Sequence, residues 1–377
     1  MQVVLFCHSL LSDWNHGNAH FLRGIVTELQ ARGHEVRVYE PYDAWSVTNL
    51  VADAGPAALH DVRAFYPRLR PFRYDEASLD VDEALDGADL VLVHEWNTPA
   101  MVAAIGRHHA RVGRYVLLFH DTHHRSVSAP AEMAQYNLSG YDGVLAFGEV
   151  IRERYVKKGW ARRAWTWHEA ADVRLFRPDV PADGGGHDHP LDLVWIGNWG
   201  DGERSQEIRD YLIEPVRRLG LRARVHGVRY PEDAKQELAA AGIEYGGWLP
   251  NYRVPQAFAA TSATVHIPRR PYVEALPGIP TIRMFEALAC GIPLVSCRWE
   301  DSEGLFRANR DYVTVDTPEE MVRAVHEVLH DPDLAAALSR AGRETILARH
   351  SCAHRVEELL AIAADISADP LRKALTA

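Results

Sequence analysis

Short, continuous apolar runs separated by helix-like segments most strongly constrain the fold of this chain. They span residues 3–7, 90–94, 115–119, 143–147 and 193–197. Strands without apolar–polar alternation are typical of parallel sheets that are covered by helices on both faces. After the first run, Asn18 can cap a helix, and a second strand over 35–39 completes a βαβ unit. The sequence therefore predicts an α/β fold whose ligands bind beyond the carboxyl ends of the strands.

Length and charge limit the classes of protein to consider. With 377 residues the chain fits two domains better than one, and an apolar share of 47% is ordinary for a globular protein. No apolar run reaches membrane-spanning length, and the N-terminus enters a strand without a basic leader. The net charge of -11 argues against broad nucleic-acid binding, with a local basic patch left as the alternative. We expect a cytoplasmic protein; the oligomeric state stays open, a homodimer included.

The cysteines and the linker histidines give no sign of a metal site. Cys7, Cys290, Cys297 and Cys352 are scattered, which predicts free thiols in a reducing compartment. His187 and His189 lie in a Gly-, Asp- and Pro-rich stretch whose composition is typical of a linker, and nothing nearby completes a ligand set. We expect an N-terminal domain over 1–178, a linker over 179–190, a second domain over 191–352 and a terminal helix within 353–377.

The stretch 277–296 is predicted to form a loop, a short helix and a strand. Thr281 is a good N-cap residue, Ile282 begins an apolar helical face, and Gly291 ends the helix. Glu286 is a carboxylate within this apolar segment, where burial is costly without hydrogen bonds. A phosphate on the free helix amides and hydroxyls held by Glu286 would together describe a nucleotide diphosphate with its ribose. The alternative is a surface ion pair between Glu286 and Arg283, three residues away.

The run from Phe285 to Ser296 resembles the donor-site helix of GT-B glycosyltransferases, especially the spore-maturation-protein type with a glycosyl transferases group 1 domain. The likeness continues through 303–306, 318–321 and 341–343, and residues 350–355 are similar to that family's H-T-x-x-x-R close. It covers roughly the last hundred residues. The resemblance implies two doubly wound, Rossmann-like domains that face a cleft, with the donor on the second and the acceptor on the first. It also implies metal-independent sugar transfer and a C-terminal helix that crosses back to the first domain.

One departure from the family leaves the stereochemistry open. Retaining members of family 4 often carry a second Glu eight residues before the first, where this chain has Gly278, and Glu274 is out of register. A nucleotide-sugar epimerase of the same fold and a non-catalytic nucleotide-sugar-binding protein remain alternatives. The expected co-substrate is a UDP- or GDP-type sugar, with no cofactor and with an unknown small molecule or glycan as acceptor.

The donor diphosphate needs positive charge and backbone amides. The glycine-rich loop that begins at Gly197 and Asn198 leads to Arg204, the best basic candidate, and Arg269 and Arg270 come next. A solvated surface position is the alternative for each arginine. The donor-binding set is expected to comprise Glu286, Arg204, Arg270, Gly278, Thr281, Ile282, Gly197 and Asn198.

The first domain offers catalytic and acceptor-side candidates. His120 ends an apolar strand, and the family resemblance implies a histidine here that contacts the donor sugar. Asp121 could orient an imidazole or act on a hydroxyl, unless both residues simply cap the following turn. If the enzyme inverts, the base would be His16, His120 or Asp121, whereas a retaining enzyme would need no such base.

The loop after the first strand supplies the acceptor-side candidates His8, Gly17 and Asn18, with a plain turn as the alternative. The basic run over 152–163 indicates a solvated helix face more than a surface for an acidic acceptor or a membrane.

Overall fold

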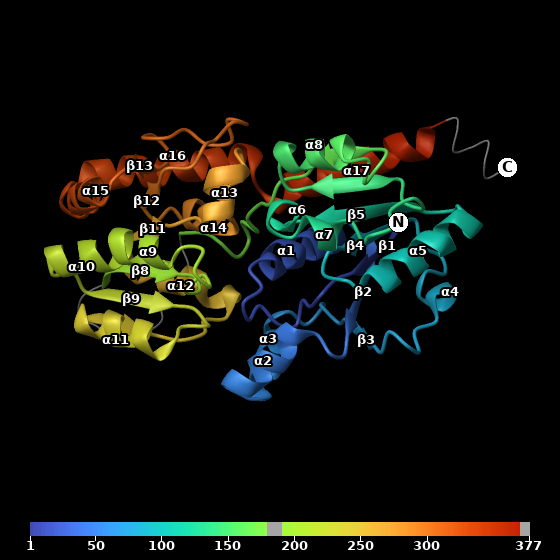
Figure 1. Ribbon diagram of the computed structural model, residues 1–377, viewed down its shortest axis with the longest axis horizontal. Helices are drawn as coiled ribbons and strands as arrows, with labels where there is room; N and C mark the ends of the chain where they lie inside the picture. The colour runs from blue at the N-terminus through green and yellow to red at the C-terminus, as the bar shows by residue number, and fades with distance from the viewer. Residues whose placement is uncertain (179–190, 370–377) are drawn as a thin grey trace. The chain divides into compact units, whose positions relative to one another are not determined.

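The computed structural model describes residues 1–178 and 191–369, which fall into two compact units. Unit 1 consists of Met1–Glu169 together with the chain from Cys352 onward, and unit 2 is Ala170–Ser351. The linker predicted over 179–190, with His187 and His189, lies outside the described residues. Each unit is built on its own parallel sheet (Figure 1). The two sheets confirm the predicted α/β fold class.

Unit 1 contains a seven-stranded sheet in the order β3-β2-β1-β4-β5-β6-β7. Its strands are β1 (Gln2–Phe6), β2 (Glu35–Pro41), β3 (Phe72–Tyr74), β4 (Leu90–His94), β5 (Val116–Asp121), β6 (Gly143–Ala146) and β7 (Ala164–Thr166). Strands β4 and β5 are buried along their whole length, which explains their continuous apolar sequences. The strand order reverses between β1 and β4. This pair marks the topological switch point of unit 1, where sheets of this kind bind ligands.

The helices of unit 1 include one from each end of the chain. Helix α17 (Cys352–Ala368) packs beside α1 (Asn18–Ala31). Arg32 donates to the Ala353 carbonyl at 3.2 Å, and the Trp167 indole N–H donates to the Arg355 carbonyl at 2.8 Å. The other helices are α2 (Trp45–Ala54), α3 (Ala57–Phe65), α4 (Val81–Ala84), α5 (Pro99–Val112), α6 (Arg125–Ser128), α7 (Pro130–Met133) and α8 (Glu149–Lys157).

Unit 2 contains a six-stranded sheet in the order β10-β9-β8-β11-β12-β13, so its switch point lies between β8 and β11. The strands are β8 (Leu191–Ile196), β9 (Ala223–His226), β10 (Ile243–Tyr245), β11 (Thr261–His266), β12 (Leu294–Cys297) and β13 (Val313–Val315). The helices are α9 (Ser205–Ile208), α10 (Glu214–Leu219), α11 (Glu232–Ala240), α12 (Val254–Ala259), α13 (Arg270–Ala275), α14 (Ile282–Cys290), α15 (Pro318–His330) and α16 (Pro332–Arg349). Val265 and Val295, on neighbouring strands, belong to the apolar core of this unit.

Helix α14 has the predicted limits, with Thr281 as N-cap and Gly291 (φ 68°) in the left-handed conformation at its end. One expectation needs correction, because Asn18 is the first residue of α1 rather than its cap. Between α9 and α10 the chain makes a π-helical turn at Arg209–Ile213. In the described ranges, no helix combines the length and the apolar character that a bilayer span requires.

Candidate functional site

The loop that follows β8 places an arginine at the switch point of unit 2. Two glycines make room for it. A Cβ on Gly197 would lie 3.1 Å from Arg204 Nη2, and one on Gly200, where φ is 92°, would lie 2.5 Å from Arg204 Cγ. Arg204 Nη1 donates to the Ile267 carbonyl at 3.0 Å, and Nη2 donates to Asn198 Oδ1 at 2.8 Å. The glycines of this loop thus allow a guanidinium to lie between the ends of β8 and β11.

The charge of Arg204 is poorly compensated. Its hydrogen-bond acceptors are neutral oxygens, its Nε is buried without a partner, and its guanidinium carbon lies 5.1 Å from the Trp195 ring centroid. Asn198 Oδ1 also accepts from Arg269 Nη2 at 3.0 Å, so two guanidinium groups share one amide oxygen. Burial and the charges of Arg269 and Arg283 lower the pKa of Arg204 to about 9. An added anion would stabilise such a cluster.

Arg270, the arginine predicted for the donor site, lies outside this cluster. Its Nε donates to Glu207 Oε1 at 2.8 Å, and the side chain is 44% exposed. Arg269 takes the inward position instead, with an ion pair to Glu203 and a side-chain exposure of 19%. The sequence names both arginines as basic candidates but gives no signal for which of two neighbours turns toward Asn198.

The start of α14 has no side-chain cap. Thr281 occupies the N-cap position, but its Oγ1 lies 2.9 Å from His266 Nε2. Ser296 Oγ donates to the Cys297 carbonyl, so it accepts from His266 Nδ1 at 2.8 Å, and His266 Nε2 in turn accepts from Thr281. Burial lowers the pKa of His266 to about 3, which keeps the ring neutral. The amides that begin at Ile282 can therefore receive an anion.

Glu286 is fully buried, and both of its oxygens are engaged. Asn251 Nδ2 donates to Oε1 at 2.7 Å, and Arg283 forms an ion pair with Oε2. The carboxylate is 0% exposed and Arg283 is 22% exposed. The ion pair is therefore not on the surface, as the alternative interpretation of the sequence required. Asn251 comes from a segment that the sequence did not single out. The structure thus shows a buried carboxylate held by two side-chain donors.

Gly278 lies in a conformation that disfavours a side chain. Its φ is 88°, and a Cβ there would lie 2.7 Å from Ser302 Oγ and 2.9 Å from Glu303 Oε1. Its N–H donates to the Glu300 carbonyl at 2.6 Å. This conformation therefore disfavours, at this position, the second carboxylate that retaining family 4 enzymes often carry there.

Four buried histidines lie at the switch point of unit 1. Successive ring centroids of His8, His16, His94 and His120 are 5.3, 6.2 and 5.2 Å apart. Burial lowers the pKa of His8 to about 4 and of His120 to about 3, and it lowers the other two pKa values as well. The rings are therefore neutral at physiological pH. Among the described residues, no group of three or more His, Cys, Asp or Glu side chains is arranged to hold a metal ion.

His120 and Asp121 are neighbours in β5 and point to opposite faces of the sheet. The His120 ring lies 4.8 Å from the Trp167 ring, centroid to centroid, and its Nε2 is buried without a partner. Asp121 accepts from the Tyr155 hydroxyl at 2.8 Å and from the His123 N–H at 3.1 Å. Asp121 therefore does not orient the His120 imidazole, because successive strand residues alternate between faces.

The carboxyl group of Asp121 belongs to a buried acid pair. Burial and the charge of Glu95 raise the pKa of Asp121 well above its usual range. Glu95 accepts from the Thr122 N–H at 2.9 Å and from Arg125 Nη2 at 2.9 Å. Asp121 is fully buried, and its contacts with Tyr155 and the His123 N–H hold the turn after β5 together.

The acceptor-side candidates occupy the end of the loop after β1. Gly17 is the N-cap of α1 with a φ of -59°, a value open to any residue. Asn18 Nδ2 and Oδ1 are buried without a partner, as is His16 Nε2. His8 Nε2 accepts from the Ser46 N–H at 3.2 Å, which leaves the ring proton on Nδ1. Unused polar groups therefore gather where this loop meets α1.

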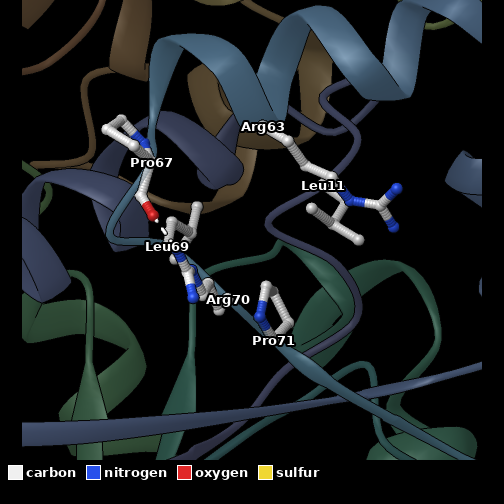
Figure 2. A pocket seen from close by; sticks show the side chains of 6 residues that line it. All are labelled: Leu11, Arg63, Pro67, Leu69, Arg70 and Pro71. Atoms are coloured by element: carbon white, nitrogen blue, oxygen red, sulfur yellow. Dashed lines mark hydrogen bonds between the residues drawn. The ribbon is translucent and has the colours of Figure 1, made fainter.

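A pocket of about 400 Å³ opens beside Leu11 of the same loop (Figure 2). It is lined by Leu11, Arg63, Pro67, Leu69, Arg70 and Pro71. Arg63 comes from α3, and Arg70 precedes β3; both side chains are exposed. Arg70 Nε donates to the Pro67 carbonyl at 3.2 Å, the bond drawn in Figure 2. None of the predicted site residues lines this pocket.

A comparison with protein families assigns the second half of the chain. The glycosyl transferase-like family model matches residues 206–361. The matched range contains α14 and Asn251, and it begins just after Arg204. No curated protein matches the sequence.

Solved structures match over almost the whole chain. A glycosyltransferase from Rickettsia africae ESF-5 is 12% identical with a TM-score of 0.67, covering 98% of this chain and 99% of that one. An alpha-glucosyltransferase in complex with UDP-glucose and DNA is 11% identical with a TM-score of 0.70, covering 96% and 99%. Anabaena HepE in complex with UDP and glucose is 15% identical with a TM-score of 0.67, covering 96% and 99%. At these identities the likeness establishes a shared GT-B fold.

Proposed function

With a glycosyl transferase-like domain on a GT-B fold, this protein is a glycosyltransferase, and we propose that unit 2 binds a nucleotide diphosphate sugar as its donor. The arginine cluster at the β8–β11 switch point carries the proposal. Arg204 is charged, has only neutral hydrogen-bond acceptors and lies near two further guanidinium groups. A diphosphate supplies the missing negative charge. Because the alpha-glucosyltransferase and HepE structures contain UDP, we expect a uridine nucleotide.

In this proposal, side chains and backbone amides stabilise the leaving diphosphate. Arg204 and Arg269 carry fixed charge beside Asn198, and the uncapped start of α14 at Thr281 and Ile282 adds amide donors. Guanidinium groups and helix amides can stabilise the negative charge of a departing phosphate, so we propose that transfer needs no metal ion. Gly197 and Gly200 contribute by leaving space for Arg204.

Glu286 holds donor hydroxyls in the same proposal. Two of its partners, Asn251 and Arg283, are side chains and can turn aside for a ribose or sugar hydroxyl. The carboxylate then keeps its hydrogen bonds while the ligand replaces one donor. This exchange accounts for a charged group on the buried face of α14, where burying an apolar residue would otherwise cost less free energy.

The proposed reaction forms one bond and breaks one. The acceptor hydroxyl oxygen bonds to the anomeric carbon, and the bond from that carbon to the diphosphate oxygen breaks. The hydroxyl proton passes to a base or to the leaving phosphate, so the products are a glycoside and a nucleoside diphosphate. The neutral His120, with Nε2 unused, can hydrogen-bond to the transferring sugar. We expect the reaction in the cytoplasm, since the four cysteines are free thiols.

A thermal-shift panel of nucleotide sugars and free nucleotides tests the proposal, because a ligand of the native state raises the melting temperature. We expect the largest shift with a UDP-sugar, and we expect it to be lost in Arg204→Ala but kept in Arg270→Ala. Equal shifts for all nucleotides, or a shift that both variants keep, would contradict the proposal. Product analysis with the identified donor then separates transfer to an acceptor from epimerisation of the sugar.

A further inference from the structure

Three tryptophans from separate segments meet at the switch point of unit 1. Trp45 begins α2, and its ring centroid lies 6.5 Å from that of Trp14 and 6.3 Å from that of Trp96. Trp14 belongs to the loop after β1 and Trp96 to the loop after β4, the two strands that flank the switch point. All three are partly exposed, unlike core tryptophans such as Trp167. We call these three residues the tryptophan platform.

Two neutral imidazoles lie next to the tryptophan platform, and Asn18 follows one of them, His16, by two residues in the chain. His8 stacks on Trp45 with ring centroids 4.6 Å apart, and His16 lies 6.4 Å from the same ring. His16 Nε2 and both polar atoms of Asn18 are buried without a partner, although these residues are only 4% and 9% exposed. An amide and a neutral imidazole offer both donors and acceptors, which is what a hydroxyl requires.

The basic groups near the tryptophan platform are already paired, and the carboxylate of Asp53 accepts from the Trp14 indole N–H at 3.0 Å. Arg125 lies 4.2 Å from the Trp96 ring centroid and donates to Glu95 at 2.9 Å. Arg23 is paired with Asp13 at 2.7 Å in the loop after β1. A phosphate or carboxylate on the acceptor would therefore have to compete with existing ion pairs. An alkyl chain would leave the unused groups of His16 and Asn18 unsatisfied.

We propose that the tryptophan platform binds a neutral carbohydrate, and that this carbohydrate is the acceptor of the transferase. One face of a pyranose ring presents C–H groups that pack on an indole, while its hydroxyls are left to hydrogen-bond with polar side chains beside the platform such as His16. Aromatic walls with a few polar groups are the usual lining of such sites. The inference rests on the proposed glycosyl transfer and adds the chemical class of its second substrate.

The two-arginine pocket of Figure 2 provides the opposing hypothesis. Arg63 and Arg70 are exposed there and would suit an acidic acceptor. This pocket, beside Leu11, belongs to the same unit as the tryptophan platform, but none of the three tryptophans lines it. Variants of the two sites therefore separate a neutral acceptor from an acidic one.

Binding is tested by the indole N–H resonances of the ten tryptophans in the full-length protein, assigned with single Trp→Phe variants. Maltose and cellobiose serve as neutral probes at millimolar concentration. We expect at least one of them to shift the Trp45 and Trp96 resonances. UDP should instead shift Trp195, which lies against Arg204. If neither disaccharide moves the Trp45 and Trp96 signals, the inference is overturned. If UDP leaves the Trp195 resonance unshifted, that result would count only against the proposed donor site.

Transfer is tested with the donor found in the thermal-shift panel and an acceptor panel of neutral disaccharides, glucuronic acid, glucose 6-phosphate and 4-methylumbelliferone. We expect transfer to a neutral saccharide, with kcat/KM about tenfold or more lower in Trp45→Ala and largely restored in Trp45→Phe. Trp160→Ala is the matched control, because Trp160 is a partly exposed tryptophan of unit 1 that packs on Tyr155 of α8.

The binding constant for UDP shows whether each variant retains a folded unit 2, and urea unfolding shows whether unit 1 is intact. If Trp45→Ala proves unstable, Trp96→Ala gives the same comparison. Preference for an acidic acceptor, with activity lost in Arg63→Ala or Arg70→Ala and kept in the tryptophan variants, would replace the inference by the opposing hypothesis. Preference for 4-methylumbelliferone over every saccharide would also overturn it.

Discussion

The two switch points of this molecule have the same strand topology and opposite chemistry. In unit 2, the loops after β8 and β11 bring together Arg204 and Arg269, with neutral oxygens as the acceptors of Arg204. In unit 1, the loops after β1 and β4 bring together neutral imidazoles and tryptophans, including His16 and Trp96. In folds of this kind the sheet sets where a ligand can bind, and the loop residues decide which ligand.

The difference also shows how each unit treats ionisable groups. Unit 2 keeps a buried charge by pairing it: Glu286 is held by Arg283 and Asn251. Unit 1 also pairs its buried charges, as in Glu95 with Arg125 at 2.9 Å, but its clustered histidines are neutral, since burial lowers the pKa of His120 to about 3. A guanidinium without a carboxylate partner fits an anionic donor, and neutral imidazoles fit a neutral acceptor, so the contrast is itself an argument for the proposed division of roles.

The strongest test of the contrast removes the central charge of unit 2. We expect Arg204→Ala to lower kcat/KM by about 10²- to 10³-fold, the usual cost of losing one group that stabilises a leaving anion. The dissociation constant for UDP should rise as well, as measured by calorimetry. Arg270→Ala is the matched control: it removes an arginine from the same segment that pairs with Glu207 at 44% exposure. Equal activities for the two variants would remove the basis of the contrast.

The second test concerns the carboxylate of α14. In Glu286→Gln the amide oxygen can still accept from Asn251, while the charge opposite Arg283 is lost. We expect kcat/KM to fall by roughly 10- to 100-fold and the free energy of unfolding by about 1–3 kcal/mol, because Arg283 loses its partner. Urea unfolding and steady-state kinetics separate the two effects. A stability loss with unchanged kinetics would make Glu286 a purely structural residue.

The general plan of both sites follows from sequence, because it depends on local patterns. Apolar runs predict buried parallel strands, and the glycines of the loop over 197–202 single out Arg204 by their spacing. The alternation rule for strands could also have separated His120 from Asp121, since neighbouring residues face opposite sides. Their joint assignment to catalysis overlooked that rule.

Other features depend on contacts between distant segments and leave no local signal. Trp14, Trp45 and Trp96 meet only because three loops converge at one sheet edge. The inward position of Arg269 depends on Asn198, which lies on another strand's loop. The crowding at Gly278 comes from Ser302 and Glu303, residues beyond β12. Side-chain partners across the sheet decide these points, and a single sequence does not record them.

A third test measures the uncharged state of unit 1 through pH. His120 has a folded pKa of about 3, below the ordinary value of 6.5 that applies in the unfolded chain. Below pH 6.5 the imidazole therefore takes up a proton in the unfolded state but not in the native state, so the free energy of unfolding falls as pH drops toward 3. The native protein should lose up to about 1.4 kcal/mol per pH unit relative to His120→Gln. Urea unfolding of both proteins from pH 7 to pH 5 gives the difference in the free energy of unfolding. If this free energy changed with pH equally in both proteins, the imidazole would be charged in the native state.

The smallest effect concerns Glu40, which holds the loop after β1. Its carboxyl accepts from the Leu10 N–H at 2.5 Å, the Leu11 N–H at 3.2 Å and Ser9 Oγ at 3.1 Å, and burial raises its pKa from 4.5 to about 7. Between pH 4.5 and 7 the carboxyl is protonated more in the native state than in the unfolded state. Its contribution to the free energy of unfolding is therefore most favourable at acid pH and is lost as pH rises. Relative to Glu40→Gln, the native protein should weaken by at most about 1.4 kcal/mol per pH unit across that window. The slope is opposite in sign to that of His120, in the same unit and under the same urea titration. Slopes of the same sign for the two variants would show that one of these groups carries charge at the switch point of unit 1, and the contrast with unit 2 would then no longer hold.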